Sequence, residues 1–62
     1  MTPRELKRWR QSMEFTQAEF AEELGVSRST VNRWEGGLQA IPKSVELLAY
    51  WRERALKIID HL

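Results

Sequence analysis

The most constraining feature of this 62-residue chain is the stretch from residue 16 to residue 37, TQAEFAEELGVSRSTVNRWEGG. Thr16 is a typical N-cap, and Glu19, three residues later, completes a capping box, so a helix is expected to begin at Gln17. Gly25 is expected to end that helix, because glycine adopts the left-handed conformation that follows a helix C-terminus without a Cβ clash. The sequence therefore predicts a short helix followed by a tight turn.

A second short helix is predicted directly after this turn. Ser27 caps it, and the pair Gly36 and Gly37 ends it after Glu35. Hydrophobic residues on either side of each cap form a staple that fixes the angle at which the chain enters the helix. The two staples are Phe15 with Phe20, and Val26 with Val31.

The apolar residues of this unit are spaced so that each helix buries a single stripe. They are Ala18, Phe20, Ala21, Leu24, Val26, Val31 and Trp34. The remaining residues are polar and are expected to point outward. The unit from residue 17 to residue 35 is thus predicted to be two amphipathic helices joined by a turn.

The second helix of this unit is predicted to present one polar face near its N-terminus, because its outward positions are one, three or four residues apart. The face consists of Arg28, Ser29, Asn32 and Arg33. Arginine donates two hydrogen bonds to guanine O6 and N7, asparagine pairs with adenine N6 and N7, and serine serves either base. No acidic residue interrupts the face, so the pattern indicates sequence-specific binding of duplex DNA.

The chain resembles the Cro/C1-type (XRE) helix-turn-helix family, the lambda-repressor-like DNA-binding domains of phage and bacterial regulators. The resemblance covers roughly residues 4 to 48. It is carried by Leu6, Arg10, Phe15, Thr16, Gln17, Ala21, Leu24, Gly25, Val26, Ser27, Val31, Trp34, Glu35, Gly37, Pro42 and Leu48. One departure is Glu14, where the family often has glycine. The resemblance implies an all-α fold of four to five helices, with a long or bipartite C-terminal helix.

The resemblance also implies roles for particular residues. The four residues of the polar face align with base-reading positions of the family. Gln17 aligns with a residue that opens the second helix and binds a DNA phosphate, and helix N-termini favour anions in any case. Ser27 sits where a contact to the DNA backbone or to a base is common, and we expect a phosphate contact. Lys43 and Gln39, near the start of the next helix, are further candidates for phosphate contacts.

A structural ion pair is expected from the resemblance as well. Arg10 and Glu35 match a pair that, in the family, packs between the first helix and the end of the third. A buried ion pair adds little net stability over an apolar pair, but removal of one partner costs roughly 3–5 kcal/mol. We therefore expect Arg10 and Glu35 to have a structural role.

The segments that flank the unit are also predicted to be helical. Thr2, Pro3 and Glu5 provide a cap, a first-turn proline and a capping-box acid for a first helix. Pro42 suits the first turn of another helix after the loop at 38–41. No glycine or proline follows it before the end of the chain, so this segment is expected to form one long helix or two helices that meet near 52–54.

The C-terminal segment, about 43–61, has more apolar residues than one core stripe requires. One line along it holds Val45, Leu48, Ala49, Arg52, Leu56 and Ile59. Off that line lie Leu47, Tyr50, Trp51 and Ile58. A monomer would hide some of this surface by folding the tail back, but apolar faces on both sides of a terminal helix favour a homodimer interface. Two recognition helices related by a two-fold axis predict a palindromic operator with half-sites about 34 Å apart.

Composition narrows the remaining function classes. The length suits one domain over residues 1–62, and the absence of cysteine excludes disulfides and thiolate metal sites. His61 has no second ligand, and no glycine-rich phosphate loop is present, so neither an enzyme nor a cofactor is expected. We see no targeting signal or membrane span, which favours the cytoplasm and its nucleoid. A net charge of only +1 argues against nonspecific binding by a basic tail.

We therefore predict a sequence-specific binder of a double-stranded DNA operator, most simply a homodimeric repressor. The alternative is an antitoxin-like or adaptor module that keeps the fold and uses the C-terminal apolar face to bind another protein. Such a module would be free to place acids or bulky apolar residues at positions 28, 29, 32 and 33. This chain places hydrogen-bond donors there.

Overall fold

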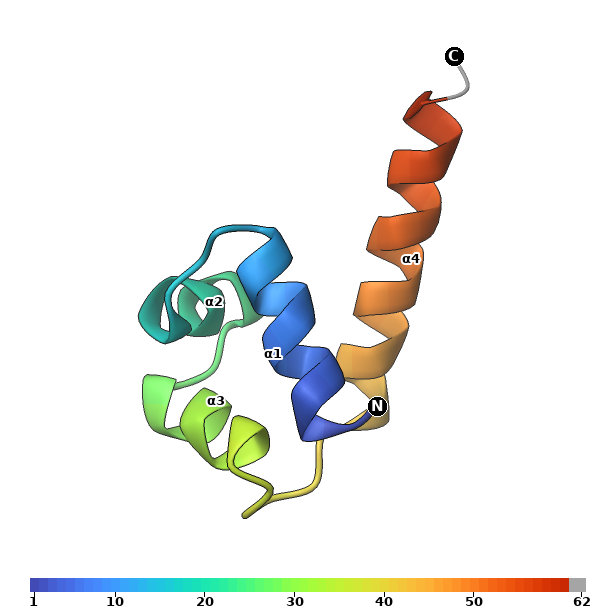
Figure 1. Cartoon of the computed structure of the whole chain (residues 1–62). Helices are drawn as coiled ribbons and strands as arrows, with labels where there is room; N and C mark the ends of the chain where they lie inside the picture. The colour runs from blue at the N-terminus through green and yellow to red at the C-terminus, as the bar shows by residue number, and fades with distance from the viewer. Residues whose placement is uncertain (61–62) are drawn as a thin grey trace.

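Four helices make up the fold in a computed structural model that describes residues 1–60, with side chains up to residue 52. They are α1 (Pro3–Ser12), α2 (Gln17–Leu24), α3 (Arg28–Glu35) and α4 (Lys43–Asp60). Figure 1 shows α1 between the α2–α3 pair and α4, and the C-terminal part of α4 extends beyond the other three helices. The predicted all-α fold is confirmed, since every element in the described range is helical.

Capping boxes fix where the first two helices begin. The Thr16 hydroxyl accepts a hydrogen bond from the Glu19 amide at 3.1 Å, and the Thr16 amide donates to the Glu19 carboxylate at 2.9 Å. Thr2 and Glu5 make the same two bonds at the start of α1, at 3.1 and 2.8 Å. These backbone bonds hold the pKa of each carboxyl below its ordinary value. Both predicted helix starts are confirmed.

The first three helices end in the same way. In each, a backbone amide just past the helix end donates to a carbonyl five residues earlier, at 2.9–3.3 Å, and the donors are Phe15, Val26 and Leu38. The motif needs one residue in the left-handed region, and Gly25 (φ 71°) and Gly37 (φ 74°) supply it for α2 and α3. In α1 the residue is Glu14 (φ 59°), which costs an L-residue roughly 1–2 kcal/mol. Glu14 thus occupies the same left-handed position at the end of α1 that glycine occupies at the ends of α2 and α3.

The core lies where α1, α2, α3 and the start of α4 meet. It consists of Leu6, Trp9, Phe20, Ala21, Val31, Trp34, Val45 and Ala49. The rings of Trp9 and Phe20 pack edge to face, with centroids 5.1 Å apart. Ala18 was predicted to share the buried stripe of α2, and this is wrong, because the side chain is exposed in the first turn of the helix. The buried part of α2 is therefore a narrow stripe through Phe20 and Ala21.

The described part of α4 joins this core through a narrow stripe as well. Val45 and Ala49, one turn apart, are buried. Leu48 was predicted to lie on the same line, and this is wrong, because Leu48 is 40% exposed and lies to one side of the stripe that Val45 and Ala49 form. An ion pair also connects α4 to α2, since the Arg52 guanidinium lies 3.8 Å from the carboxylate of Glu23.

Candidate nucleic-acid interface

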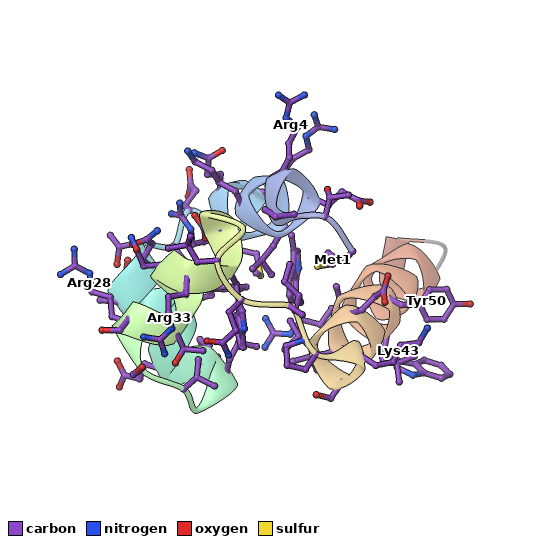
Figure 2. All side chains as sticks on the ribbon, turned by 90° about the horizontal axis from the view of Figure 1, so that it is seen from below. Met1, Arg4, Arg28, Arg33, Lys43 and Tyr50 are labelled. Atoms are coloured by element: carbon purple, nitrogen blue, oxygen red, sulfur yellow. The ribbon has the colours of Figure 1, made fainter. Side chains whose placement is uncertain are left out.

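Four side chains of α3 gather on one exposed surface, which we call the α3 polar face. They line a shallow hollow of about 340 Å³ and are Arg28, Ser29, Asn32 and Arg33. Figure 2 shows Arg28 and Arg33 projecting from α3 on the side of the molecule away from α4, where Lys43 and Tyr50 lie. The structure therefore brings together all four residues that were predicted to read bases.

The orientation of this face follows from the core positions of the same helix. Val31 is fully buried and Trp34 is 2% exposed, so the residues between them must turn toward solvent. Ser27 begins the helix, and its hydroxyl accepts a hydrogen bond from the Thr30 amide at 3.2 Å. No acid lies in the first turn of α3, which leaves the partial positive charge of the helix N-terminus unopposed there.

The Arg33 guanidinium is held by two neighbours. Its Nε donates to Oε1 of Gln39 at 2.9 Å, and its Nη2 donates to the Thr30 hydroxyl at 3.3 Å. The Thr30 hydroxyl also lies 2.8 Å from the Ser27 hydroxyl. Thr30 therefore connects the N-cap of α3 to Arg33 on the polar face. Gln39 was expected to be a candidate for a phosphate contact. No periodicity predicts its contact with Arg33, because Gln39 lies in the irregular segment between α3 and α4.

The Asn32 amide is connected to the interior through Gln17. Its Nδ2 donates to Gln17 Oε1 at 3.4 Å, and Gln17 Nε2 donates in turn to Glu35 Oε1 at 3.3 Å. The resemblance to the family suggested only a phosphate contact for Gln17. In the structure its side chain, at the first position of α2, lies between a residue of the polar face and a buried carboxylate.

That carboxylate belongs to an ion pair between α1 and α3. Arg10 donates to Glu35 through Nε at 2.7 Å and through Nη2 at 3.0 Å, and its Nη1 donates to the Phe15 carbonyl at 2.8 Å. The side chains are only 11% and 5% exposed. The hydrogen bonds with Glu35 raise the pKa of Arg10 above its ordinary value. Arg10 thus links α1, the turn before α2 and the end of α3 at the back of the polar face.

The predicted phosphate-contacting residues are dispersed. Gln17 and Ser27 lie at the N-termini of α2 and α3, next to the polar face, and the Ser27 hydroxyl already serves as a cap. Lys43 lies at the start of α4, where its side chain is 81% exposed and 4.0 Å from the Glu46 carboxylate. Figure 2 places Lys43 well away from Arg33. Lys43 therefore lies apart from the α3 polar face.

A second exposed surface lies on α4, and we call it the α4 apolar face. It includes Leu47, Tyr50 and Trp51, which are 48%, 52% and 61% exposed. The rings of Tyr50 and Trp51 meet edge to face with centroids 5.6 Å apart. Ile58, the fourth residue predicted for a dimer interface, lies outside the described side chains. The apolar face is thus a compact aromatic surface beside Leu47 on the first half of α4.

The described residues include no group of three or more His, Cys, Asp or Glu side chains placed to hold a metal ion. No helix in the described range is both long and apolar enough to cross a membrane.

Comparison with known proteins gives one result. A family model described as helix-turn-helix matches residues 6–50, which include α2, α3 and most of α1. The matched range is more than half of the chain and contains the α3 polar face, the Arg10–Glu35 ion pair and Gln17. No curated protein and no solved structure matches the chain.

Proposed function

Since this chain belongs to the Cro/C1-type (XRE) helix-turn-helix family of DNA-binding transcription regulators, we propose that it recognises a specific operator as a homodimer and represses transcription. The family is one of regulatory DNA-binding domains, not typically of enzymes. A single domain over residues 1–62 would carry both activities. Residues 17–35 would bind the DNA, and a helical segment at about 43–61 would hold the dimer together.

The proposed reading element is α3, inserted in the major groove with its N-terminal half against the base edges. The observation that carries this proposal is the gathering of four exposed hydrogen-bonding side chains around one hollow of α3. Arg28 and Arg33 would donate to guanine, Asn32 would pair with adenine, and Ser29 would serve either. A hydrogen-bonded arginine or asparagine at such a face discriminates against a wrong base by about 1–3 kcal/mol per bidentate contact.

Phosphate contacts would set the position of α3 in the groove. Gln17 suits this role even though its side chain is already engaged, because Nε2 carries two hydrogens and donates only one of them to Glu35. The second hydrogen and the amides at the start of α2 are available to a phosphate. Ser27 at the start of α3 and Lys43 at the start of α4 would add contacts on either side.

Dimerisation is proposed to use the α4 apolar face. Large apolar side chains grouped on one surface gain free energy when a partner covers them, and burial of one such side chain is worth about 1.5–3 kcal/mol. Leu47, Tyr50 and Trp51 would form the centre of a two-fold interface, with Ile58 further along the helix. The two copies of α3 would then face half-sites about 34 Å apart on one side of the DNA.

The biological consequence would be repression by occupancy. A dimer bound to an operator that overlaps a promoter would block access of the polymerase to the promoter. We place this activity in the cytoplasm, at the nucleoid of a bacterium or of a phage-infected cell. The amount of protein and competition for the operator would control it, and no cofactor is invoked.

The test is selection from a randomised pool of duplex DNA, about 24 base pairs long, at near-physiological salt of about 0.15 M. The duplexes that the purified protein retains would be sequenced. The proposal predicts a recovered palindrome whose half-sites are one helical turn apart. Retention without enrichment, disappearing as salt rises, would contradict it, because that behaviour comes from phosphate attraction alone.

A second candidate function rests on the exposure of the α4 apolar face. An antitoxin-like or adaptor module would use Tyr50 and Trp51 to bind a different protein, and α3 would then contribute little. This candidate predicts that the pool selection recovers no motif and that the purified chain is a monomer. The position of Arg28 and Arg33 on one face argues for the DNA-binding proposal over this alternative.

A further inference from the structure

Arg33 is the one arginine of the α3 polar face whose guanidinium is held in place by other side chains in the described structure. A guanidinium has five N–H donors. Gln39 occupies the donor on Nε at 2.9 Å, and the Thr30 hydroxyl occupies one donor on Nη2 at 3.3 Å. Three donors are left, namely both on Nη1 and one on Nη2. The guanidinium is therefore fixed along one edge and has a pair of adjacent nitrogens free at its end.

The free end has the donor pattern that guanine accepts. Guanine presents two acceptors in the major groove, O6 and N7, whereas adenine presents the N7 acceptor beside an N6 donor. An arginine with Nη1 and Nη2 directed at a base edge can satisfy both acceptors of guanine. Against adenine, one of those donors would meet another donor. Fixing Nε in a bond with Gln39 also removes the alternative in which Arg33 uses its Nε edge.

We propose that Gln39 is a positioning residue that sets the base preference of Arg33, and that the preferred base is guanine. This inference rests on the proposed function, since it takes Arg33 to be a base reader. Gln39 need not touch DNA to act. Its amide oxygen selects which donors of Arg33 face the groove, so a residue outside α3 contributes to the specificity of α3.

The backbone explains how a residue of the connecting segment reaches Arg33. The carbonyl of Arg33 accepts a hydrogen bond from the Leu38 amide at 2.9 Å, and Gly37 adopts a left-handed φ of 74° to allow it. The chain thus folds back over the end of α3 directly before Gln39. As a result, two hydrogen bonds hold Arg33 in place. Its backbone carbonyl accepts from the Leu38 amide, and its side chain donates to Gln39.

The neutral charge of Gln39 is part of the inference. An amide oxygen accepts from Nε and leaves the positive charge of Arg33 available to the DNA. A carboxylate at this position would also accept from Nε, but it would oppose that charge and repel nearby phosphates. Gln39→Ala and Gln39→Glu therefore separate two properties: the first removes the acceptor, and the second keeps the acceptor while it adds negative charge.

The experiment measures binding of the full chain to the duplex recovered from the pool and to three variants with each other base at the Arg33 position. The proteins are wild type, Gln39→Ala, Gln39→Glu, Arg33→Ala and the double variant Arg33→Ala with Gln39→Ala. Gln11→Ala, at an exposed glutamine of α1, is the matched control. The Nε–H signal of Arg33 in the NMR spectrum of the free protein reports the contact with Gln39 without any DNA.

We expect Gln39→Ala to reduce the preference for guanine by about three- to tenfold, the equivalent of one net hydrogen bond. Gln39→Glu should keep the preference and lower affinity for all four duplexes. In the Arg33→Ala background, Gln39→Ala should change nothing further. The melting temperature should stay within the range of the Gln11→Ala control, and the Arg33 Nε–H signal should shift in Gln39→Ala but not in Gln11→Ala.

Two outcomes would overturn the inference. If Gln39→Ala weakens binding to all four duplexes equally, Gln39 binds a phosphate instead; if it changes neither base preference nor the Nε–H signal, Gln39 does not position Arg33. Neither outcome would contradict the proposed function if Arg33→Ala still lost affinity only for the duplex with the preferred base. A uniform loss for Arg33→Ala would instead count against the proposed reading role of Arg33 itself.

Discussion

The α3 polar face and the α4 apolar face are both exposed, but their side chains are held in different ways. Asn32 and Arg33 are tied by hydrogen bonds to Gln17 and Gln39, so much of their freedom is already lost before a ligand arrives. Trp51 is 61% exposed on a helix that meets the core only through a narrow stripe. Exposure alone therefore says little about how a surface is used.

The difference implies two modes of binding. A preorganised polar face loses little further entropy on binding and favours a ligand with matching donors and acceptors. An apolar face has no such directional preference and gains free energy from whatever surface covers it. Under the proposed function, the α3 polar face would determine which DNA is bound, and the α4 apolar face would determine how many copies bind together.

The largest expected effect comes from removing the support behind the α3 face. Glu35→Ala leaves Arg10 nearly buried without its partner and should lower the free energy of unfolding by roughly 3–5 kcal/mol. A domain of this size has little stability to spare, so we expect substantial unfolding at room temperature. Urea denaturation followed by circular dichroism measures the change. Glu22→Ala, at an exposed acid of α2, should be close to wild type.

If the Glu35→Ala and Glu22→Ala proteins had the same free energy of unfolding, the ion pair would not stabilise the helices that carry the polar face. Replacing both partners, as in Arg10→Met with Glu35→Leu, sharpens the test. A buried ion pair and a well-packed apolar pair have similar stability, so the double variant should recover much of the loss.

The next largest effect is expected on the α4 face. Trp51→Glu places a charge in the centre of the proposed dimer interface and should weaken dimerisation by about 2 kcal/mol or more. Helix content should stay near wild type, because Trp51 is exposed and lies outside the core. Sedimentation equilibrium measures the dimer. Trp51→Phe keeps an aromatic ring and should retain most of the association, whereas equal monomer populations for wild type and Trp51→Glu would exclude this face.

A single side chain of the α3 face should have a smaller and more local effect. Arg33→Ala should cost roughly 1–3 kcal/mol of DNA-binding free energy and relax the preference at one base position. Gln17→Ala should weaken binding to all sites alike, because a phosphate contact carries no sequence information. Fluorescence anisotropy with a panel of single-base variants distinguishes the two. If Arg33→Ala lost the same amount of affinity for every DNA variant, Arg33 would not read a base.

A modest gain in stability is expected at the end of α1. Glu14→Gly should stabilise the domain by about 0.5–1 kcal/mol, because relief of the left-handed strain slightly exceeds the entropy cost of glycine in the unfolded chain. The substitution lies outside both faces, so base preference and dimerisation should not change. Thermal unfolding monitored by circular dichroism measures the shift. A lower melting temperature would mean that the Glu14 side chain has a stabilising role of its own.

The smallest effect concerns acid sensitivity. The Glu19 carboxylate accepts hydrogen bonds at the start of α2, and its pKa is lowered in the folded state. Its contribution to stability is therefore present above the unfolded value near 4.5 and is lost as the pH falls through the lower folded value. Glu19→Gln should reduce the dependence of stability on pH in that acidic range. An unchanged pH profile would indicate that Glu19 does not contribute through its charge.

Local signals in the sequence were sufficient to predict most of the fold. The caps at Thr16 and Ser27 and the left-handed turn at Gly25 depend on residues within a few positions of one another, and the structure has all three. The exposed orientation of the α3 face also follows from the periodicity of Val31 and Trp34. Elements defined by short-range hydrogen bonds can thus be predicted from the sequence.

Contacts between side chains of different elements could not be predicted in the same way. The Gln39–Arg33 contact depends on the path of the segment between α3 and α4, and the Gln17–Asn32 contact depends on how α2 packs against α3. No periodicity encodes either. The exposure of Leu48 depends on how closely α4 approaches the core, a tertiary property. The resemblance to a family suggested the Arg10–Glu35 pair, but not the hydrogen bonds through which Gln17 connects it to Asn32.

A protein–DNA double-mutant cycle tests whether the α3 polar face reads bases. One partner is Arg33→Ala, and the other is the selected duplex with 7-deazaguanine at the guanine assigned to Arg33, which lacks the N7 acceptor. The account predicts that this DNA change weakens binding of the wild-type protein and has no further effect on Arg33→Ala. The same loss for both proteins would contradict it, because Arg33 would then not be the group that contacts that base.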